Sequence, residues 1–490
     1  MALHLAMPLL FVLKPHLMKK HTTLYTLLFF TNLIFCQCFT TLNSGFWHVS
    51  GIKSDGTLWG RGSGNFGQLN NGTRFEELTA VPISSTADWQ KLFAGSAANF
   101  AIKNNGTLWG TGANTQGVLG IGTSATSSST FVQIGMAGNW RQISSDLHTI
   151  GVRTDGSIWG WGFNDFGQVG NGNLQDEYAP VRIGTDNDWK EVDAKGNRVS
   201  FGIKTNGTLW AWGGNINNWL GSGNFSWFVP TQHNAATDRK TVSGGWAHAL
   251  MLKTNNTLWA LGRDIAAGPH GPVDFPDIPL QIGTDTNWAS ISAGFRVSFA
   301  IKTNGTLWAW GKNDGIHGPG GGALLNAGLL GDGTTIDRPN PVQIGTDTNW
   351  ATVSAGYFSV VATKTNGAVY TWGLNNQGQL GNGNLDDTVL VPTLITIPDC
   401  TLVNLSFTKK EPFSIAPNPA KDKVTINFET TTQPPTIEIY DLFGRLITSH
   451  QPTTTVGGWE LSTLNFSAGV YLVVLKENNA VVAQQKLIKQ

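Results

Sequence analysis

The chain repeats one short sequence seven times, and this repeat restricts the fold more than any other feature. Each copy is an Asn-Gly, Asp-Gly or Asn-Asn pair followed by Thr-Leu-Trp or a close variant. Successive copies end 50, 50, 51, 49, 49 and 62 residues apart. A period of this length predicts a stacked or circular array of similar units rather than several unrelated domains. The copies end at Trp59, Trp109, Trp159, Trp210, Trp259, Trp308 and Tyr370.

One period has the pattern of four short β-strands. β-Branched and aromatic residues crowd both sides of Asn304-Gly305, which predicts a hairpin with a two-residue type I′ turn, in which both turn positions need a positive φ. A Gly-rich connection, as in "WGFNDFGQVGNG" from Trp161, then leads to a Pro-containing strand such as "PVQIG" from Pro341. Four strands per period, with almost no helical periodicity, predict an all-β chain that forms a seven-bladed β-propeller.

The tryptophans fit the packing of such blades. A two-stranded ribbon alone cannot bury enough apolar surface, so each unit must pack on its neighbours. Of the 20 tryptophans, 10 lie at hairpin exits and five more open the next inner strand. We therefore expect most of them to pack between blades rather than to bind sugars. The five are Trp89, Trp140, Trp189, Trp288 and Trp350.

Residues 1–36 have the pattern of a leader. From Met18, two lysines and an apolar run to Phe35 predict a secretory signal peptide over residues 18–36, with Met18 as the true start. A retained membrane anchor and a lipoprotein are the alternatives, but the run is short for a bilayer span, which needs roughly 20 residues. We expect no transmembrane segment in the mature chain.

Two of the three cysteines match the same position of the repeat. Counted from equivalent residues of the last two repeats, Cys38 and Cys400 both correspond to Asn349. They approach the seam of the ring from opposite chain ends, which predicts a disulfide in an oxidising compartment. The bond would close a loop of more than 300 residues, for which the chain-entropy estimate is on the order of 4 to 5 kcal/mol or more. Two free buried thiols are the alternative.

The composition changes after Cys400. Residues 401–412 form a polar linker, and residues 413–490 alternate apolar and polar residues like a small antiparallel β-sandwich. Four motifs, "PNP", "YDLFGR", "GVYLV" and "KLIK", follow one another there. Their key residues are Pro417, Asn418, Pro419, Tyr440, Asp441, Gly444, Arg445, Gly469, Tyr471, Lys486 and Lys489.

Together these motifs resemble the C-terminal sorting domain of proteins exported by the type IX secretion system of Bacteroidetes. The resemblance implies an interaction with that machinery and passage through the outer membrane. The C-terminal domain would be the sorting signal, which is often removed as the protein is released or attached to surface lipopolysaccharide. A plain adhesive sandwich is the alternative.

The repeats from residue 37 to 400 also have a family. Their pattern is complete in "NSGFWHVSGIKSDGTLWGRGSGNFGQLNNG" apart from Asn70, and it resembles the regulator of chromosome condensation repeat. Seven such repeats imply a seven-bladed propeller, in agreement with the count of periods. Family members range from nuclear exchange factors to plant photoreceptors and a secreted bacterial enzyme inhibitor, so the fold alone does not fix the function.

The sequence predicts no catalytic, cofactor-binding or metal site. His48, His148 and His248 fill one repeat position in three non-adjacent blades, which is more simply structural than a metal site in the channel. Most carboxylates lie in turn sequences, where Asp is a common turn former. The segment "GPGGG" from Gly318 lacks the Lys-Ser/Thr ending of a phosphate-binding loop, and no EF-hand pattern is present.

Repeats four to six depart most from the common pattern, and the sixth is longer by 12 residues. Loops on a rigid scaffold commonly carry binding sites, so we expect one continuous binding face there, with Trp219 and Trp227 as aromatic anchors. Neutral variation of loops is the alternative. The candidate residues are Trp219, Trp227, Phe228, His270 and His317.

The net charge is zero and 13% of residues are charged, which does not suit a nucleic-acid partner. We expect a non-enzymatic propeller, secreted or on the outer cell surface, that binds a protein or glycan. The alternatives are an enzyme inhibitor or hydrolase-associated module acting through blades four to six, and a structural or adhesive component. Guanine-nucleotide exchange is not expected of a secreted chain. A clustered acid–base set in the folded chain would favour catalysis, and an aromatic patch would favour binding.

Overall fold

The computed structural model of this chain describes the propeller and the C-terminal domain, each apart from short segments. The described residues are 39–196, 198–215, 226–246, 248–262, 279–317, 324–325, 328–385, 388–397, 413–429, 434–441, 445–477 and 480–490. The leader, both cysteines of the expected disulfide and the linker 401–412 lie outside them.

Seven four-stranded antiparallel sheets follow one another around a ring, which confirms the seven-bladed propeller. Each blade takes all four strands from one repeat, in sequence order from the channel outward. The first three blades are β1 (Phe39–Ser44), β2 (His48–Lys53), β3 (Leu58–Gly62), β4 (Glu77–Pro82); β5 (Trp89–Ala94), β6 (Ala98–Lys103), β7 (Leu108–Ala113), β8 (Ser127–Gln133); and β9 (Trp140–Ser145), β10 (His148–Arg153), β11 (Ile158–Gly162), β12 (Glu177–Ile183). A short 3-10 turn, η1 (Thr115–Gly117), follows β7.

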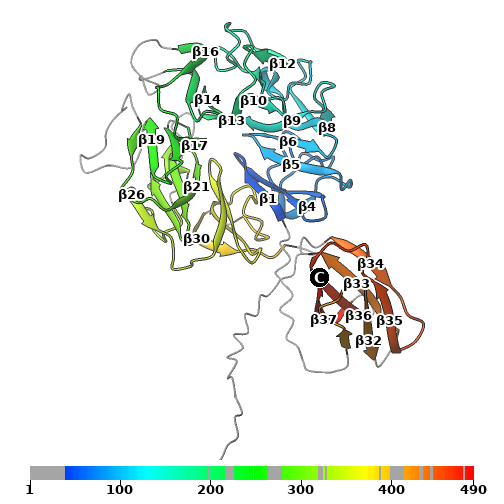
Figure 1. Cartoon of the computed structure of the whole chain (residues 1–490). Helices are drawn as coiled ribbons and strands as arrows, with labels where there is room; N and C mark the ends of the chain where they lie inside the picture. The colour runs from blue at the N-terminus through cyan, green and yellow to red at the C-terminus, as the bar shows by residue number, and fades with distance from the viewer. Residues whose placement is uncertain are drawn as a thin grey trace, which may run out of the picture. The chain divides into compact units, whose positions relative to one another are not determined.

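The other four blades have the same order (Figure 1). They are β13 (Trp189–Gly196), β14 (Val199–Lys204), β15 (Leu209–Gly214), β16 (Ser226–Gln232); β17 (Arg239–Gly244), β18 (His248–Lys253), β19 (Leu258–Gly262), β20 (Leu280–Gln281); β21 (Trp288–Ala293), β22 (Val297–Lys302), β23 (Leu307–Gly311), β26 (Arg338–Gln343); and β27 (Trp350–Ala355), β28 (Ser359–Lys364), β29 (Val369–Leu374), β30 (Thr388–Leu394).

The hairpin between β22 and β23 is confirmed, but its turn differs from the expected type I′. The Lys302 N–H donates to the Thr306 carbonyl at 3.0 Å, so three residues form the loop rather than two. Gly305 has a φ of 76°, whereas the φ of Asn304 is not positive. The loop is therefore of the kind in which a turn is followed by one left-handed glycine. The type I′ prediction was wrong because only the glycine has to leave the common backbone regions.

The repeated motif forms one chain of polar contacts at this turn. Asn304 Oδ1 accepts hydrogen bonds from the Thr306 N–H (3.2 Å) and the Thr306 hydroxyl (2.8 Å), as in an Asx turn. The Trp308 indole N–H donates to that hydroxyl at 2.9 Å. Lys302 Nζ lies 3.9 Å from the centre of the Trp308 ring and 2.9 Å from Asp285. The Lys, Asn, Thr and Trp of the motif thus each make a contact that stabilises the turn.

The tryptophans that open the inner strands are all buried, which confirms their expected role in packing. Trp288 is typical: its ring lies edge-on to that of Trp308, 6.0 Å away, and 6.5 Å from that of Trp310. Trp310 itself has no exposed surface and belongs to the same core cluster as Trp288. The hydrophobic cores therefore lie between adjacent sheets, as the stacked repeat requires.

The ring closes with a contact that other blades also use. The Gly383 N–H of the seventh blade donates to the Leu78 carbonyl of the first at 3.1 Å, as the Gly172 N–H of the third blade donates to the Phe228 carbonyl of the fourth at 3.0 Å. β1 also packs against β27 and β28, where the blue and yellow parts of the ring meet in Figure 1. No strand is exchanged between the end blades among the described residues.

Blade six keeps the regular loop closure in spite of its insertion. The Leu330 N–H donates to Asn313 Oδ1 at 3.0 Å, although the two residues are 17 apart. In blade three, the same bond joins residues only five apart, Val169 and Asn164, at 2.9 Å. The 12 extra residues therefore lie between Asn313 and Leu330. They include the short paired strands β24 (Ile316–His317) and β25 (Leu324–Leu325).

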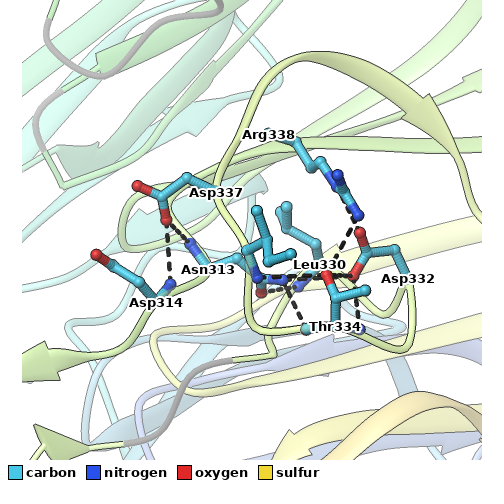
Figure 2. A network of polar contacts seen from close by, with 8 residues as sticks. Asn313, Asp314, Leu330, Asp332, Thr334, Asp337 and Arg338 are labelled. Atoms are coloured by element: carbon cyan, nitrogen blue, oxygen red, sulfur yellow. Dashed lines mark hydrogen bonds and ion pairs between the residues drawn. The ribbon is translucent and has the colours of Figure 1, made fainter.

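Carboxylates hold the two ends of this insertion together, as Figure 2 shows. Asp337 Oδ1 accepts from the Asn313 N–H at 2.7 Å and from the Asp314 N–H at 3.1 Å. Arg338 Nε donates to Asp332 Oδ2 at 2.7 Å. The residues on either side of the insertion are thus joined to one another by hydrogen bonds.

The C-terminal domain consists of two sheets around a separate core. One sheet has the order β31-β32-β35, and the other has the order β34-β33-β36-β37. Ile426, Ile437 and Val473 are fully buried between them, so a small β-sandwich is confirmed. Its strands are β31 (Phe413–Ala416), β32 (Lys423–Glu429), β33 (Thr436–Asp441), β34 (Leu446–His450), β35 (Val456–Ser462), β36 (Gly469–Glu477) and β37 (Ala480–Lys489).

Candidate functional site

The turns between the first and second strands of the blades surround one end of the central channel. This end is termed the mouth end, and the opposite end, which carries the turns of the repeated motif, the Asx end. Residues from all seven blades line a space of about 330 Å³ at the mouth, part of it open to solvent. The third strand of each blade ends beside the start of the second, as Gly62 pairs with His48. The long connections of blades four to six therefore leave from the mouth end.

The neck of the channel is narrow because glycines let adjacent blades approach. In five blades the turn has three residues and begins with glycine. A Cβ on Gly356 would lie 2.2 Å from the carbonyl oxygen of Gly45, and one on Gly245 would lie 2.5 Å from that of Gly294. The Phe46 N–H donates to the Ser96 carbonyl at 2.9 Å across the boundary between blades one and two. The backbones of adjacent turns are thus in direct contact around the neck, and they hold the side chains at the mouth in place.

Aromatic rings occupy the middle of the turn in four of these five blades. They are Phe46, Tyr357, Phe295 and Trp246, on blades one, seven, six and five, which are neighbours around the ring. Ring centres are 4.5 Å apart for Phe46 and Tyr357, 5.3 Å for Tyr357 and Phe295, and 4.9 Å for Phe295 and Trp246. All four residues are half-buried. This continuous row of rings is termed the aromatic arc.

Polar and charged residues occupy the other side of the mouth, and they are termed the polar arc: Ser96, Asp146 and Lys195, on blades two, three and four. The Tyr357 hydroxyl crosses the channel and donates to Asp146 Oδ2 at 2.7 Å. The Ser96 hydroxyl donates to the Asp146 carbonyl oxygen at 3.2 Å. The mouth is therefore apolar on one side and hydrogen-bonding on the other.

Two carboxyl groups beside the channel titrate far above their ordinary range. Burial raises the pKa of Asp146 to about 7, although the Tyr357 hydrogen bond and the charge of Lys195 act in the opposite direction. Burial likewise raises the pKa of Asp193 to about 6, against the Lys195 charge and hydrogen bonds from the Lys195 and Gly244 N–H groups. Burial also raises the pKa of Tyr357, so its hydroxyl remains a donor.

This acid–base group is one that the sequence did not reveal. Asp146 and Tyr357 are 211 residues apart and meet only because blades three and seven lie across the channel from each other. The available signal was the variation in the turn after the inner strand, where four repeats have an aromatic residue and two others have Ser or Asp.

The three repeat-position histidines are buried between blades, as a structural role requires. Burial lowers the pKa of His48 to about 4 and that of His148 to about 3. No group of three metal-ligating side chains exists in the part of the chain that the structure describes. Each histidine Nε2 bonds a polar residue of the next blade: His48 to Asn99 (3.1 Å), His148 to Ser200 (2.6 Å) and His248 to Ser298 (3.0 Å).

The structure describes three of the five candidate binding residues of blades four to six. Trp227 and Phe228 lie in β16, the outermost strand of blade four, and not in a loop. Trp227 is partly buried against two core clusters, whereas Phe228 is 42% exposed. His317 belongs to β24, while Trp219 and His270 lie outside the described residues.

The first and last sorting motifs of the C-terminal domain are hydrogen-bonded to each other. Asn418 Nδ2 donates to the Lys486 carbonyl, and Asn418 Oδ1 accepts from the Ile488 N–H at 2.9 Å. Pro417, Asn418, Pro419 and Lys486 are all exposed. The first and last motifs thus form one accessible patch beside the C-terminal strand.

The middle motifs lie in and beside the sheet β34-β33-β36-β37. Tyr471 is buried and its hydroxyl donates to the Ser467 carbonyl at 2.9 Å. Arg445 Nε donates to Asp441 Oδ2 at 2.9 Å. Among the remaining motif residues, Gly469 pairs with Lys489, Tyr440 donates to Glu438, and Gly444 lies outside the described residues.

Comparison with known families agrees with both parts of the chain. Residues 414–490 match the secretion system C-terminal sorting domain. Residues 155–197 and 366–404, and also 288–315 and 350–379, match the regulator of chromosome condensation (RCC1) repeat. No curated protein matches the chain. No helix among the described residues is long and apolar enough to cross a membrane.

Solved structures share the propeller fold. Prp20p from Saccharomyces cerevisiae matches with a TM-score of 0.60 and 19% identity, over 74% of this chain and 88% of that one. Human WBSCR16 matches with a TM-score of 0.57 and 19% identity, over 66% of this chain and 85% of that one. At such identities the likeness extends to the fold alone. The chain therefore carries a seven-bladed propeller of regulator of chromosome condensation repeats and, at its C-terminus, a type IX secretion system sorting domain, which indicates secretion or attachment to the cell surface.

Proposed function

We propose that this chain is an exported, non-enzymatic binding propeller whose ligand, a protein or glycan of the cell surface, is held at the mouth end of the channel. The observation that carries the proposal is the aromatic arc. Half-buried aromatic rings gathered at a concave, water-accessible site are typical of binding sites, because they offer a large contact area with few rotamers to fix. The irregular connections of blades four to six leave from the same end and could extend the site.

Export supports this location for the ligand. The sorting domain implies an interaction with the type IX machinery, and the leader at residues 18–36 would supply the earlier step across the inner membrane. A propeller delivered in this way meets outer-surface proteins and polysaccharides. A purely adhesive component would not need an arc confined to four consecutive blades.

A second candidate function, hydrolysis of a surface polymer, is favoured by one observation. Asp146 and Asp193 are buried carboxyl groups with raised pKa values near the mouth of the channel, and such groups are common general acids and bases. Release of new reducing ends from cell-surface polysaccharide by the chain, but not by its Asp146→Asn variant, would establish this alternative.

The binding proposal is tested with cells of the native organism that lack the gene. The purified chain, starting at Gln37, is mixed with intact cells, and the bound fraction is measured after sedimentation. We expect saturable binding that falls several-fold in the double variant Trp246→Ala/Phe295→Ala. Phe75→Ala is the matched control, since it removes a 72% exposed ring outside the arc. Equal binding of the two variants, or no saturable binding at all, would end the proposal.

A further inference from the structure

The aromatic arc is a feature that blade packing does not require. Ser96 takes the middle turn position in blade two, and its carbonyl still accepts the hydrogen bond that joins blades one and two. The arc residue Tyr357 is half-buried, whereas its neighbour Phe358 is only 5% exposed and belongs to the packed interior. The rings of the arc stack on one another and on this interior, and the exposed part of each ring is available to a ligand.

The polar arc restricts the charge of that ligand. Among the residues that line the space, a phosphate or carboxylate would meet Asp146, with Asp193 buried nearby, and Lys195 is the one cation that would offset the repulsion. A cationic ligand would instead compete with Lys195 for the same carboxyl groups. Because burial raises both carboxyl pKa values, the two groups carry only part of their charge in mildly acidic solution. A neutral ligand with hydroxyl groups fits this side of the mouth best.

We propose that the mouth binds a neutral pyranose residue of a surface glycan, with its apolar C–H face against the aromatic arc and its hydroxyl groups bonded to the polar arc. A pyranose ring has both characters at once, since its C–H face is apolar and each hydroxyl can donate and accept. The space at the mouth is small and part of it is open to solvent, so the ligand would reach it through one terminal sugar residue at the rim rather than through a long segment. This inference rests on the proposed binding function and names its ligand class.

The two sides of the mouth are coupled through Tyr357. Its ring stacks on Phe46 at 4.5 Å, while its hydroxyl bonds Asp146 on the opposite blade. A sugar hydroxyl that approaches Asp146 would replace or share the bond from Tyr357. Tyr357→Phe keeps the stacked ring and removes only that hydroxyl, so it separates the contribution of the ring from that of the polar contact.

Saturation-transfer NMR with the full chain from Gln37 tests the inference. The probes are the methyl pyranosides of glucose, galactose and mannose, with methyl glucuronide as the anionic probe. We expect transfer to ring C–H protons of at least one neutral glycoside and none to the glucuronide. The half-saturating concentration should rise by about tenfold or more in Trp246→Ala/Phe295→Ala, because truncated aromatic anchors dominate such sites. It should stay unchanged in Phe75→Ala.

Thermal unfolding of each variant shows first that it is folded. Lack of transfer from every neutral glycoside to the folded chain, or equal transfer in the arc and Phe75 variants, would overturn the pyranose assignment. If cell binding still depends on the arc while glycosides fail, the ligand is a protein, and the proposed binding function stands without this inference. If both assays fail, both proposals fall together.

Discussion

The two ends of the propeller differ in how closely the seven blades repeat one another. At the Asx end, every blade places a cation over the aromatic residue of its motif, with the Lys302 and Trp308 pair as the typical case. At the mouth end, the turns carry aromatic rings on four neighbouring blades but Ser96 and Asp146 on the next two. The cation and ring pairs are Lys53–Trp59, Lys103–Trp109, Arg153–Trp159, Lys204–Trp210, Lys253–Trp259, Lys302–Trp308 and Lys364–Tyr370.

This difference separates the residues that every blade needs in order to fold from those that vary between blades. The repeated end closes each hairpin with local bonds, so any change there alters the folding of one unit. The varied end uses the same backbone contacts with different side chains, so changes there alter the surface but leave the blades intact. Stability and binding should therefore respond to mutation at opposite ends of one channel.

The largest effect is expected at the seam, where the repetition stops. Phe39 and Ile397 lie in one core cluster, and Cys38 and Cys400 are their close neighbours in sequence. We expect a Cys38–Cys400 disulfide, and Cys38→Ser/Cys400→Ser should lower the free energy of unfolding by on the order of 4 to 5 kcal/mol. Mass spectrometry after alkylation, with and without reductant, provides the direct check. Two alkylatable thiols in the unreduced chain would show that the seam needs only the contacts used by the other blades.

Removal of one core tryptophan tests the comparison most directly. Trp310 has no exposed surface, and Trp310→Ala should lower the free energy of unfolding by about 3 to 5 kcal/mol because a large cavity remains. Trp246→Ala, at the mouth, should cost about 1 kcal/mol or less, since it loses mainly a partly exposed stacking contact with Phe295. Denaturant titration measures both. Equal losses would mean that the arc is as structural as the core.

The pH dependence of the free energy of unfolding should reflect the raised pKa values of Asp146 and Asp193 near the mouth. Folding raises the pKa of Asp146 from 3.8 to about 7, so the folded state binds more protons than the unfolded state between these values. The contribution of Asp146 to the free energy of unfolding is largest below about pH 4. It falls as the pH rises towards 7 and no longer changes above that. The slope is at most about 1.4 kcal/mol per pH unit. Asp193, with its pKa raised to about 6, adds a change of the same sign.

Asp146→Asn isolates this contribution. The buried histidines act in the opposite direction: the pKa of His48 falls from 6.5 to about 4 and that of His148 to about 3, so their contribution is lost as the pH drops below 6.5. The variant leaves Asp193 and the histidines in place. The stability difference between variant and parent should change between pH 4 and 7 and be constant above. A difference that is flat over the whole range would show that Asp146 is ionised in the fold.

The sequence predicted the constant parts of the molecule far better than the varied ones. Blade number, strand order and tryptophan burial followed because local pattern and global packing agree in every repeat. The type I′ turn was wrong because a period of strands does not reveal whether two or three residues close the Asn304-Gly305 loop. The pairing of Asp146 with Tyr357 was missed because it depends on the diameter of the closed ring, which no local pattern encodes. Trp227 was assigned to a loop because the sequence around it is irregular, yet it lies in β16.

The smallest effect concerns a single hydroxyl at the Asx end. Thr306→Val keeps the shape of the side chain but removes the acceptor of the Trp308 indole N–H and the donor to Asn304 Oδ1. We expect a loss of about 1 kcal/mol in the free energy of unfolding, the usual net value of such hydrogen bonds. Blade seven provides the matched control, because Ala368 stands at this position and its N–H still donates to Asn366 Oδ1 at 3.1 Å. Ala368→Val changes the methyl groups without losing a hydroxyl. If Thr306→Val costs no more than Ala368→Val, the backbone bond alone closes the turn, and the threonine of the repeat must be explained by something other than the stability of its blade.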